Sequence, residues 1–447
     1  MANGVIERYE DDQLVVALPD LEVVKKALAE LGVRCKKEDP DEALGLALLS
    51  LANVSGTPAL HDDLKLVAEA KQAKWGKDAP KNATLPDLDL LLHKMYTDFA
   101  HRFRGWVPVM GKNRVIAPVT GFPYVGGGGQ GVPDPYVGGG GVGDPHDNGA
   151  TCQTGGANPP RSVSPVPWPQ RASRPGDGVR VGLLDTRLYP NQWLAGGYLA
   201  AEDDLIENPA PDQPALLASQ GHATFVAGLI LRGAPGARLD VRPVLNAKEF
   251  GNVWDVAKTM AGFLGSGVDI LNLSFGCYTD DGRPPLVLAR AVNLVSPEIL
   301  LVAAAGNHGK VGGSANGLTR KTPMWPGAFD DVTAVIAGEV VDGKRHLAPF
   351  SPELPWVDVM APGDHVESTY LTSPVELSTN SKGHARRASR TVAFEGGFAC
   401  WAGTSFAAAN VSGAVAAKTV PGRRNAREAL KLVLESGGNI QRYLYDY

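Results

Sequence analysis

Three side chains that can share one reaction occur in the order Asp185, His222 and Ser405. Asp185 and His222 each stand at one end of an apolar segment, and Ser405 follows a Gly-Thr pair. A serine hydroxyl becomes a nucleophile when an imidazole takes its proton, and a carboxylate orients that imidazole and stabilises its cation. Asp before His before Ser is one of the known chain orders of such a triad. The three residues therefore predict acyl transfer through a serine nucleophile.

Ser405 stands where a tight turn opens into a run of small residues, 406–413. The free N–H groups and the dipole at a helix N-terminus can stabilise an oxyanion, and Asn307 adds a carboxamide donor after another apolar segment. Taken singly, Ser405 is more simply a helix cap, Asp185 a cap, His222 a core histidine and Asn307 a turn residue. The nucleophilic interpretation depends on all four occurring in one sheet.

The elements that must position these residues follow a regular pattern from Asp177 onward. Short, almost continuously apolar runs alternate with helix-length segments, and such runs are typical of strands buried on both faces. The runs are residues 179–184, 239–245, 268–273, 299–304 and 332–336. The alternation predicts an α/β fold with a parallel sheet and helices on both faces. Functional residues in such a sheet gather at the carboxyl ends of the strands.

From about residue 177 to 437 the chain resembles the subtilisin-like serine proteases. The aspartate, histidine and serine segments of that family resemble residues 181–186, 222–228 and 403–413. Three further segments resemble the family in the same order, namely 234–237, 271–276 and 357–363. The resemblance implies a subtilisin-like parallel sheet and a serine endopeptidase that forms an acyl-enzyme.

The resemblance also implies a role for each site residue. His222 would act as the general base for Ser405, Asp185 would orient the imidazole, and Asn307 with the Ser405 N–H would hold the oxyanion. The implied substrate-binding residues are Ser274, Phe275, Gly276, Ala304, Ala305 and Gly306. Because none of them is charged, we expect a preference for uncharged, mostly apolar residues before the cleaved bond. The substrate would be a protein or peptide.

No cofactor is expected. The family resemblance allows a structural calcium ion, but the chain has no carboxylate-dense loop that would predict one. His61, His93 and His101 are isolated along the chain, whereas metal sites need clustered ligands.

Two departures from the family pattern leave the reacting groups untouched. Ala223 follows the histidine where the family usually has Gly, and Ala409-Asn410 replaces a usual Pro-His pair. One alternative is a subtilisin-fold scaffold that binds without catalysis, but the four intact site residues favour an enzyme. An esterase is a second alternative, although its usual Gly-x-Ser-x-Gly motif is not met, since residue 407 is Ala.

The chain divides into three parts by composition. Residues 1–120 are predicted to form a small, mainly helical domain with an apolar strand at each end, including helices at about 40–53, 61–75 and 86–103. Residues 121–176 are rich in Gly and Pro and are predicted to be a linker. Residues 177–447 are predicted to be the peptidase domain.

The role of residues 1–120 has two interpretations. The family's usual prodomain is an α+β inhibitor packed directly before the catalytic domain, and a mainly helical domain followed by a long linker fits that poorly. We therefore expect a recruitment or sensing module that binds a protein partner. A removable inhibitor is the alternative.

Composition excludes several classes of function. The 43 Lys and Arg nearly balance the 48 Asp and Glu, so we expect neither a nucleic-acid partner nor a membrane. The first residues contain no apolar segment of the kind that an export signal needs, which predicts a cytoplasmic protein. The four cysteines, Cys35, Cys152, Cys277 and Cys400, are widely scattered and are predicted to be thiols.

Overall fold

The fold was analysed in a computed structural model of the chain. The structure describes residues 7–55, 57, 60, 62–75, 84–119, 160–164, 168, 175–207, 209, 214–246, 250–309, 319–341, 344–379, 388–394 and 396–445. The predicted linker, residues 121–176, lies mostly outside these ranges. Within it, β5 (Arg161–Ser162) pairs with β20 (Phe398–Trp401).

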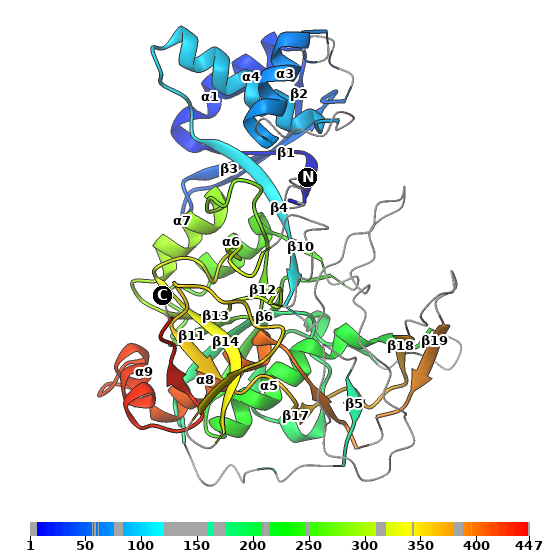
Figure 1. The fold of residues 1–447 in the computed structure, drawn as a ribbon, viewed down its shortest axis with the longest axis vertical. Helices are drawn as coiled ribbons and strands as arrows, with labels where there is room; N and C mark the ends of the chain where they lie inside the picture. The colour runs from blue at the N-terminus through cyan, green and yellow to red at the C-terminus, as the bar shows by residue number, and fades with distance from the viewer. Residues whose placement is uncertain are drawn as a thin grey trace.

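A central sheet organises the C-terminal two thirds of the chain (Figure 1). Its strands run in the order β21, β16, β14, β13, β11, β6, β9 and β7, and every neighbouring pair is parallel except β16 with β21. Their bounds are β6 (Arg180–Asp185), β7 (Tyr198–Leu199), β9 (Arg238–Pro243), β11 (Ile270–Leu273), β13 (Leu300–Ala304), β14 (Val332–Val341), β16 (Val359–Ala361) and β21 (Gln441–Arg442). The parallel sheet predicted from the apolar runs is confirmed.

Helices cover both faces of this sheet, as the sequence predicts. The helices are α5 (His222–Gly233), α6 (Val253–Ala261), α7 (Leu286–Val295), α8 (Thr404–Lys418) and α9 (Ala426–Glu435). Val181 and Leu183 of β6 share a buried cluster with α5, α8 and α9, whereas Leu184 shares one with α6 and α7. Strand side chains that alternate between the two faces therefore build two separate cores.

The small residues of α8 let it lie very close to α5. A Cβ atom placed on Gly413 would come within 2.9 Å of the Ile230 carbonyl oxygen. The close approach brings the start of α8, with Ser405, to the same edge of the sheet as the start of α5, with His222.

Short strands complete this part of the fold. They are β8 (Leu216–Leu217), β10 (Gly251–Asn252), β12 (Phe275–Gly276), β15 (Lys344–Leu347), β17 (Val366–Thr369), β18 (Val375–Thr379) and β19 (Ala388–Val392). The strands β10 and β12 both pair with a strand from the N-terminal part of the chain.

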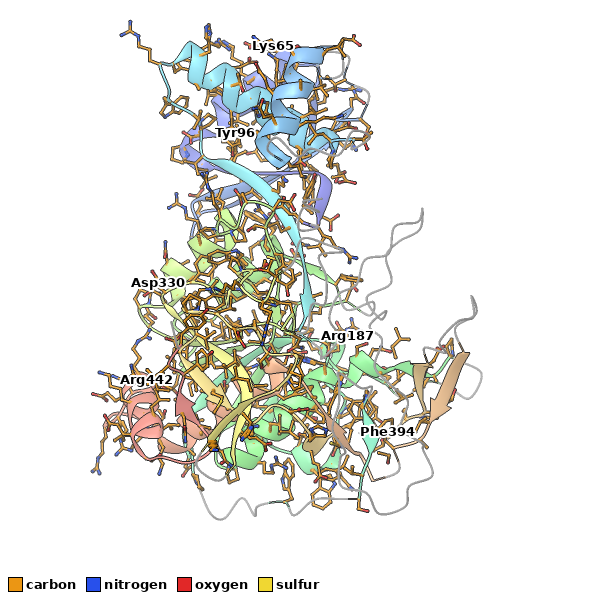
Figure 2. All side chains as sticks on the ribbon, in the orientation of Figure 1. Lys65, Tyr96, Arg187, Asp330, Phe394 and Arg442 are labelled. Carbon is orange, nitrogen blue, oxygen red and sulfur yellow. The ribbon has the colours of Figure 1, made fainter. Side chains whose placement is uncertain are left out.

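The described N-terminal residues, 7–119, form an α+β unit. Its elements are β1 (Tyr9–Ala17), α1 (Leu21–Glu30), β2 (Arg34–Asp41), β3 (Leu46–Ala52), α3 (Leu64–Trp75), α4 (Asp87–Arg102) and β4 (Met110–Pro118). The antiparallel sheet has the order β4, β1, β3, β2. Tyr96, labelled in Figure 2, joins α4 to this sheet, since its hydroxyl donates to the Met110 carbonyl oxygen at 2.6 Å.

One local prediction for this unit is wrong. The helix predicted at about 40–53 is replaced by the end of β2 and by β3. Leu and Ala have high helix propensity, but β3 pairs with strands on both sides and buries side chains on both faces. Tertiary pairing outweighs the modest propensity difference.

One face of the N-terminal sheet packs on α6 and α7. Val15, Ala17, Leu46 and Ile116 belong to the same buried cluster as α6 and α7. In Figure 1 the N-terminal unit lies above these helices, and β4 runs down from it to β10. The unit is therefore folded back on the rest of the chain.

Candidate active site

The structure brings Asp185 and His222 together. Asp185 ends β6 and His222 begins α5, and His222 Nδ1 lies 2.7 Å from Asp185 Oδ1 and 2.9 Å from Oδ2. Both side chains are fully buried. The Thr186 N–H also donates to Asp185 Oδ1 at 2.7 Å. The carboxylate is thus fixed where it can orient the imidazole.

Aromatic rings enclose the other side of the histidine. The Trp401 ring meets His222 edge-on with centroids 5.9 Å apart, and the Phe406 ring lies 5.5 Å away. His222 Nε2 is buried and has no hydrogen-bond partner among the described residues. A buried ring nitrogen without a partner costs free energy, and such groups often belong to a catalytic site.

Ser405 lies in the first turn of α8 and is fully buried. Its Oγ donates to the Val119 carbonyl oxygen at 2.6 Å and lies 3.3 Å from the Ser274 carbonyl oxygen. In this structure, therefore, the serine hydroxyl is bonded to the carbonyl at the end of the N-terminal unit and not to His222.

Asn307 contacts the same carbonyl oxygen. Its Nδ2 donates to the Val119 oxygen at 3.0 Å, while its Oδ1 accepts from the Thr404 N–H at 3.0 Å and the Thr404 hydroxyl at 3.1 Å. The Thr404 hydroxyl also lies 3.1 Å from the Gly306 carbonyl oxygen. Thr404 thus orients the carboxamide, a role that sequence reasoning missed because threonine beside a nucleophile is a common residue.

The end of β4 occupies the groove next to these groups. The Val119 N–H donates to the Ser274 carbonyl oxygen at 3.0 Å, and residues 117–118 pair antiparallel with β12. On its other side β4 pairs with β10, where Ile116 lies opposite Gly251. A strand held between two others in this way is how an extended peptide is recognised by strand addition.

The predicted substrate-binding residues divide into three groups. Ser274, Phe275 and Gly276 all contact the end of β4 through backbone pairing. Ala304 packs against the Val119 side chain, as does Met324, which sequence reasoning missed. Ala305 belongs to a different buried cluster, and the Gly306 N–H donates to the Thr404 hydroxyl.

Polar contacts also join the N-terminal unit to α6. Asp39 accepts from Trp254 Nε1 at 2.8 Å, and its carboxylate lies 3.1 Å from Lys258 Nζ. The Trp254 hydrogen bond, followed by that from Lys258, lowers the pKa of Asp39. Asn113 Oδ1 accepts from the Trp254 N–H at 3.0 Å.

A second contact region surrounds Asp280. This carboxylate lies 3.0 Å from Lys74 Nζ and accepts from the Glu7 N–H at 3.1 Å. Burial raises its pKa. The N-terminal unit is thus held to the rest of the chain at two polar regions, in addition to the strand pairing.

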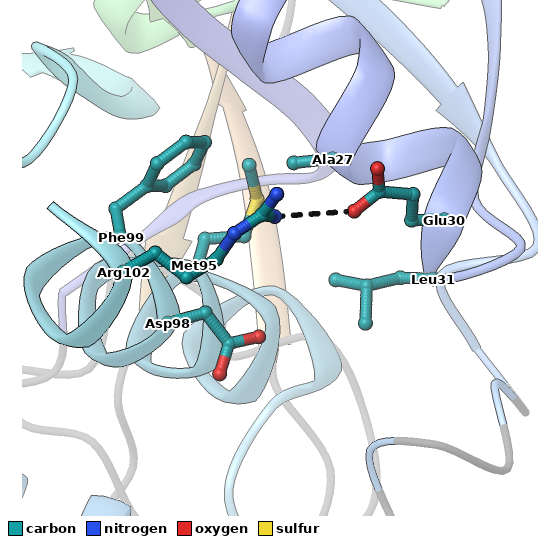
Figure 3. Close-up of a pocket in the computed structure, with 7 residues that line it drawn as sticks. All are labelled: Ala27, Glu30, Leu31, Met95, Asp98, Phe99 and Arg102. Atoms are coloured by element: carbon teal, nitrogen blue, oxygen red, sulfur yellow. Dashed lines mark hydrogen bonds and ion pairs between the residues drawn. The ribbon is translucent and has the colours of Figure 1, made fainter.

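A hollow in the N-terminal unit lies between α1 and α4 (Figure 3). It is lined by Ala27, Glu30, Leu31, Met95, Asp98, Phe99 and Arg102. Arg102 pairs with Glu30 across it at 3.3 Å. None of the predicted site residues lines this hollow.

In the part of the chain that the structure describes, no three His, Cys, Asp or Glu side chains cluster closely enough to hold a metal ion. Within the same ranges, no helix combines the length and apolar character needed to cross a membrane.

The prediction that all four cysteines are thiols is wrong. Cys35 and Cys277 are free, and burial raises the pKa of the Cys277 thiol to about 12. Cys400, in β20, is disulfide-bonded. Scattered cysteines carry no spacing signal, so this bond could not be read from the sequence.

Comparisons with known proteins point to one family. The model of the subtilase family matches residues 176–425, more than half of the chain. A thermostable alkaline protease from Halalkalibacterium halodurans is 32% identical over 44% of this chain and 50% of its own length. Subtilisin Savinase from Lederbergia lenta is 32% identical over 47% of this chain and 74% of its own length. The chain thus spans about half the length of the first of these relatives.

A solved structure has the same fold over almost the whole chain. Fervidolysin from Fervidobacterium pennivorans, a keratinolytic enzyme related to subtilisin, aligns with a TM-score of 0.53 and 17% identity. The alignment covers 98% of this chain and 60% of fervidolysin. At this identity the likeness shows the fold alone.

The prediction of a cytoplasmic protein is contradicted by the relatives. They include the minor extracellular protease Epr of Bacillus subtilis, 30% identical over 45% of this chain and 29% of its own length. The disulfide at Cys400 agrees with this correction, because disulfides persist mainly in oxidising environments outside the cytoplasm.

Proposed function

Because the chain belongs to the subtilase family, we propose that it is a serine endopeptidase that forms an acyl-enzyme on Ser405. The observation that carries the proposal is the position of the Val119 carbonyl group. Its oxygen accepts hydrogen bonds from both Ser405 Oγ and Asn307 Nδ2, at the end of a strand paired in the groove. A substrate carbonyl would need the same two neighbours.

Each side chain has a role in the proposed reaction. His222 Nε2 takes the proton of Ser405 Oγ as the oxygen attacks the carbonyl carbon, and it returns that proton to the leaving amine. Asp185 stabilises the imidazolium that forms. Asn307 Nδ2 and the Ser405 N–H stabilise the oxyanion. His222 Nε2 is buried and has no hydrogen-bond partner among the described residues, which supports the base role because the atom can accept the serine proton.

The arrangement of β4 supports an inhibitory role for the N-terminal unit in place of the expected recruitment module. Its last described residue, Val119, fills the position that a substrate residue needs, so the groove is closed to other peptides while the unit is bound. The proposed enzyme cleaves its own chain after Val119 and becomes active when the unit leaves. Protein and peptide substrates then enter the same groove.

Active-site labelling tests the enzyme class. After incubation to allow self-cleavage, a fluorophosphonate probe should label the wild-type protein at Ser405, and Ser405→Ala should abolish labelling. Ser412→Ala is the matched control, since Ser412 is another fully buried serine of α8 and donates to Asn272 Oδ1 at 3.0 Å. Labelling that survives in Ser405→Ala, or that is lost equally in Ser412→Ala, would contradict the assignment. A wild-type protein that binds peptides without labelling would favour a catalytically silent scaffold.

A further inference from the structure

We propose that Met324 shortens the pocket that receives the residue before the cleaved bond, so that the enzyme selects valine-sized aliphatic side chains there. The inference rests on the proposed function and adds the substrate class. It starts from the side chain of Val119, which is buried against Ala304 and Met324, with Tyr278 packed beside them.

Met324 lies between the two glycine walls of this pocket. A Cβ atom on Gly276 would come within 2.8 Å of Met324 Cγ, Sδ and Cε, and a Cβ atom on Gly306 within 3.2 Å of Met324 Sδ. Met324 therefore occupies the space that a side chain at Gly276 or Gly306 would need. Met324 is only 3% exposed, so it fills space that a longer substrate side chain would need.

Tyr278 and His308 lie beside the methionine. The Tyr278 hydroxyl lies 3.0 Å from His308 Nδ1, and their rings are perpendicular with centroids 5.4 Å apart. A Cβ atom on Gly306 would be 2.6 Å from His308 Nδ1, which places the pair next to the same wall. Burial lowers the pKa of His308 to about 4, so the imidazole is neutral near pH 7. Among the described residues, the side chains packed around Val119 therefore carry no charge near pH 7.

The size of the expected selectivity follows from pocket chemistry. One methylene too many or too few in an apolar pocket changes kcat/KM by roughly 10- to 200-fold. Methionine is flexible and can move partly aside, which keeps the effect within this range for an aromatic side chain. An arginine side chain would also lose hydration without gaining a partner, and it should be cleaved more slowly still.

The test uses full-length protein that has been allowed to cleave itself. Its substrates are chromogenic peptides with the chain's own sequence, Ile-Ala-Pro-X, where X is Val, Ala, Phe or Arg. We expect kcat/KM for X = Val to exceed that for X = Phe by roughly 10- to 200-fold. In Met324→Ala the Phe to Val ratio should rise at least tenfold. The ratio does not depend on how much of the variant folds, so partial loss of stability does not affect it.

Met360→Ala provides the matched control. Met360 is also fully buried, but it lies in β16 in a different cluster, so its truncation should leave the Phe to Val ratio unchanged. A wild-type preference for Phe, or a ratio that Met324→Ala and Met360→Ala change equally, would overturn the inference while leaving the peptidase intact. Failure of the wild-type protein to cleave any of these peptides would overturn the proposed function and this inference with it.

Discussion

The proposed oxyanion donor, Asn307, is held in place by its neighbour Thr404. Asn307 uses its oxygen to accept two hydrogen bonds from Thr404, which leaves the amide Nδ2 directed at the carbonyl oxygen of Val119. Without the Thr404 hydroxyl the carboxamide would keep only the bond from the backbone N–H. Thr404 is therefore a positioning residue that acts through Asn307.

Substitution of these two residues should lower turnover to different extents. Asn307→Ala should reduce kcat by roughly 100- to 1,000-fold, since one oxyanion donor is lost. Thr404→Val keeps the shape but removes the hydroxyl, and a hydrogen bond of about 1 kcal/mol predicts a loss of roughly fivefold. Thr404→Ser should restore kcat, and KM should change little in each case. A Thr404→Val loss that Thr404→Ser does not rescue would indicate a packing role instead.

At this scale the sequence supplies candidates for the reacting groups more readily than for their neighbours. Asp185, His222 and Ser405 could be proposed because each borders an apolar segment, and that pattern is local. Val119 and Met324 could not be found in this way. Val119 lies 286 positions before Ser405, and its contact depends on how two distant parts of the chain fold together.

At the scale of elements, β4 is both part of the N-terminal sheet and the occupant of the groove. Its first half pairs with β1, and its last half pairs with β10 and β12. The sequence predicts the central sheet well, because strands buried on both faces are almost continuously apolar. The sequence predicts β3 badly, because its Leu and Ala residues have high helix propensity. The strand forms because β1 and β2 pair with it on both sides.

The contact between β2 and α6 predicts how the N-terminal unit responds to pH. Asp39 has a pKa below its ordinary value of 3.8, so its contribution to binding is present above that value and is lost as the pH falls through the lowered pKa. Asp39→Asn should therefore weaken retention of the cleaved unit near pH 7. The difference from wild type should begin to shrink only below pH 3.8, and it should vanish once the pH has fallen through the lowered pKa of Asp39. Size-exclusion chromatography of the self-cleaved protein measures this retention.

Comparing Asp39→Asn with the wild type at each pH isolates the effect of Asp39 on retention from the effect of Asp280. Burial raises the pKa of Asp280, so its ionisation opposes binding as the pH rises, and this effect is common to both proteins. Glu38→Gln is the matched control, because Glu38 pairs with Lys25 at 3.0 Å inside the N-terminal unit. A loss of retention in Glu38→Gln as large as in Asp39→Asn would show that Asp39 has no specific role in retaining the N-terminal unit.

At the scale of the whole molecule, the N-terminal unit covers α6 and α7 and places its last strand in the groove. Apolar packing, the contacts of Asp39 and Asp280, and the paired end of β4 all act on one side of the catalytic fold. Composition could not predict this docking, because an interface between two parts of one chain has no sequence signature. We propose that the molecule is a self-inhibited peptidase in which Ser405 cleaves the peptide bond that follows Val119.

The most direct test is the intact mass and N-terminal sequence of full-length protein after incubation near pH 7. The wild-type chain should separate into two fragments, with Val119 ending the first and Thr120 beginning the second. Ser405→Ala should remain a single chain of full mass under the same conditions, and Ser412→Ala should cleave as the wild type does. A wild-type chain that stays intact, or a Ser405→Ala chain that is cut at the same bond, would contradict the account.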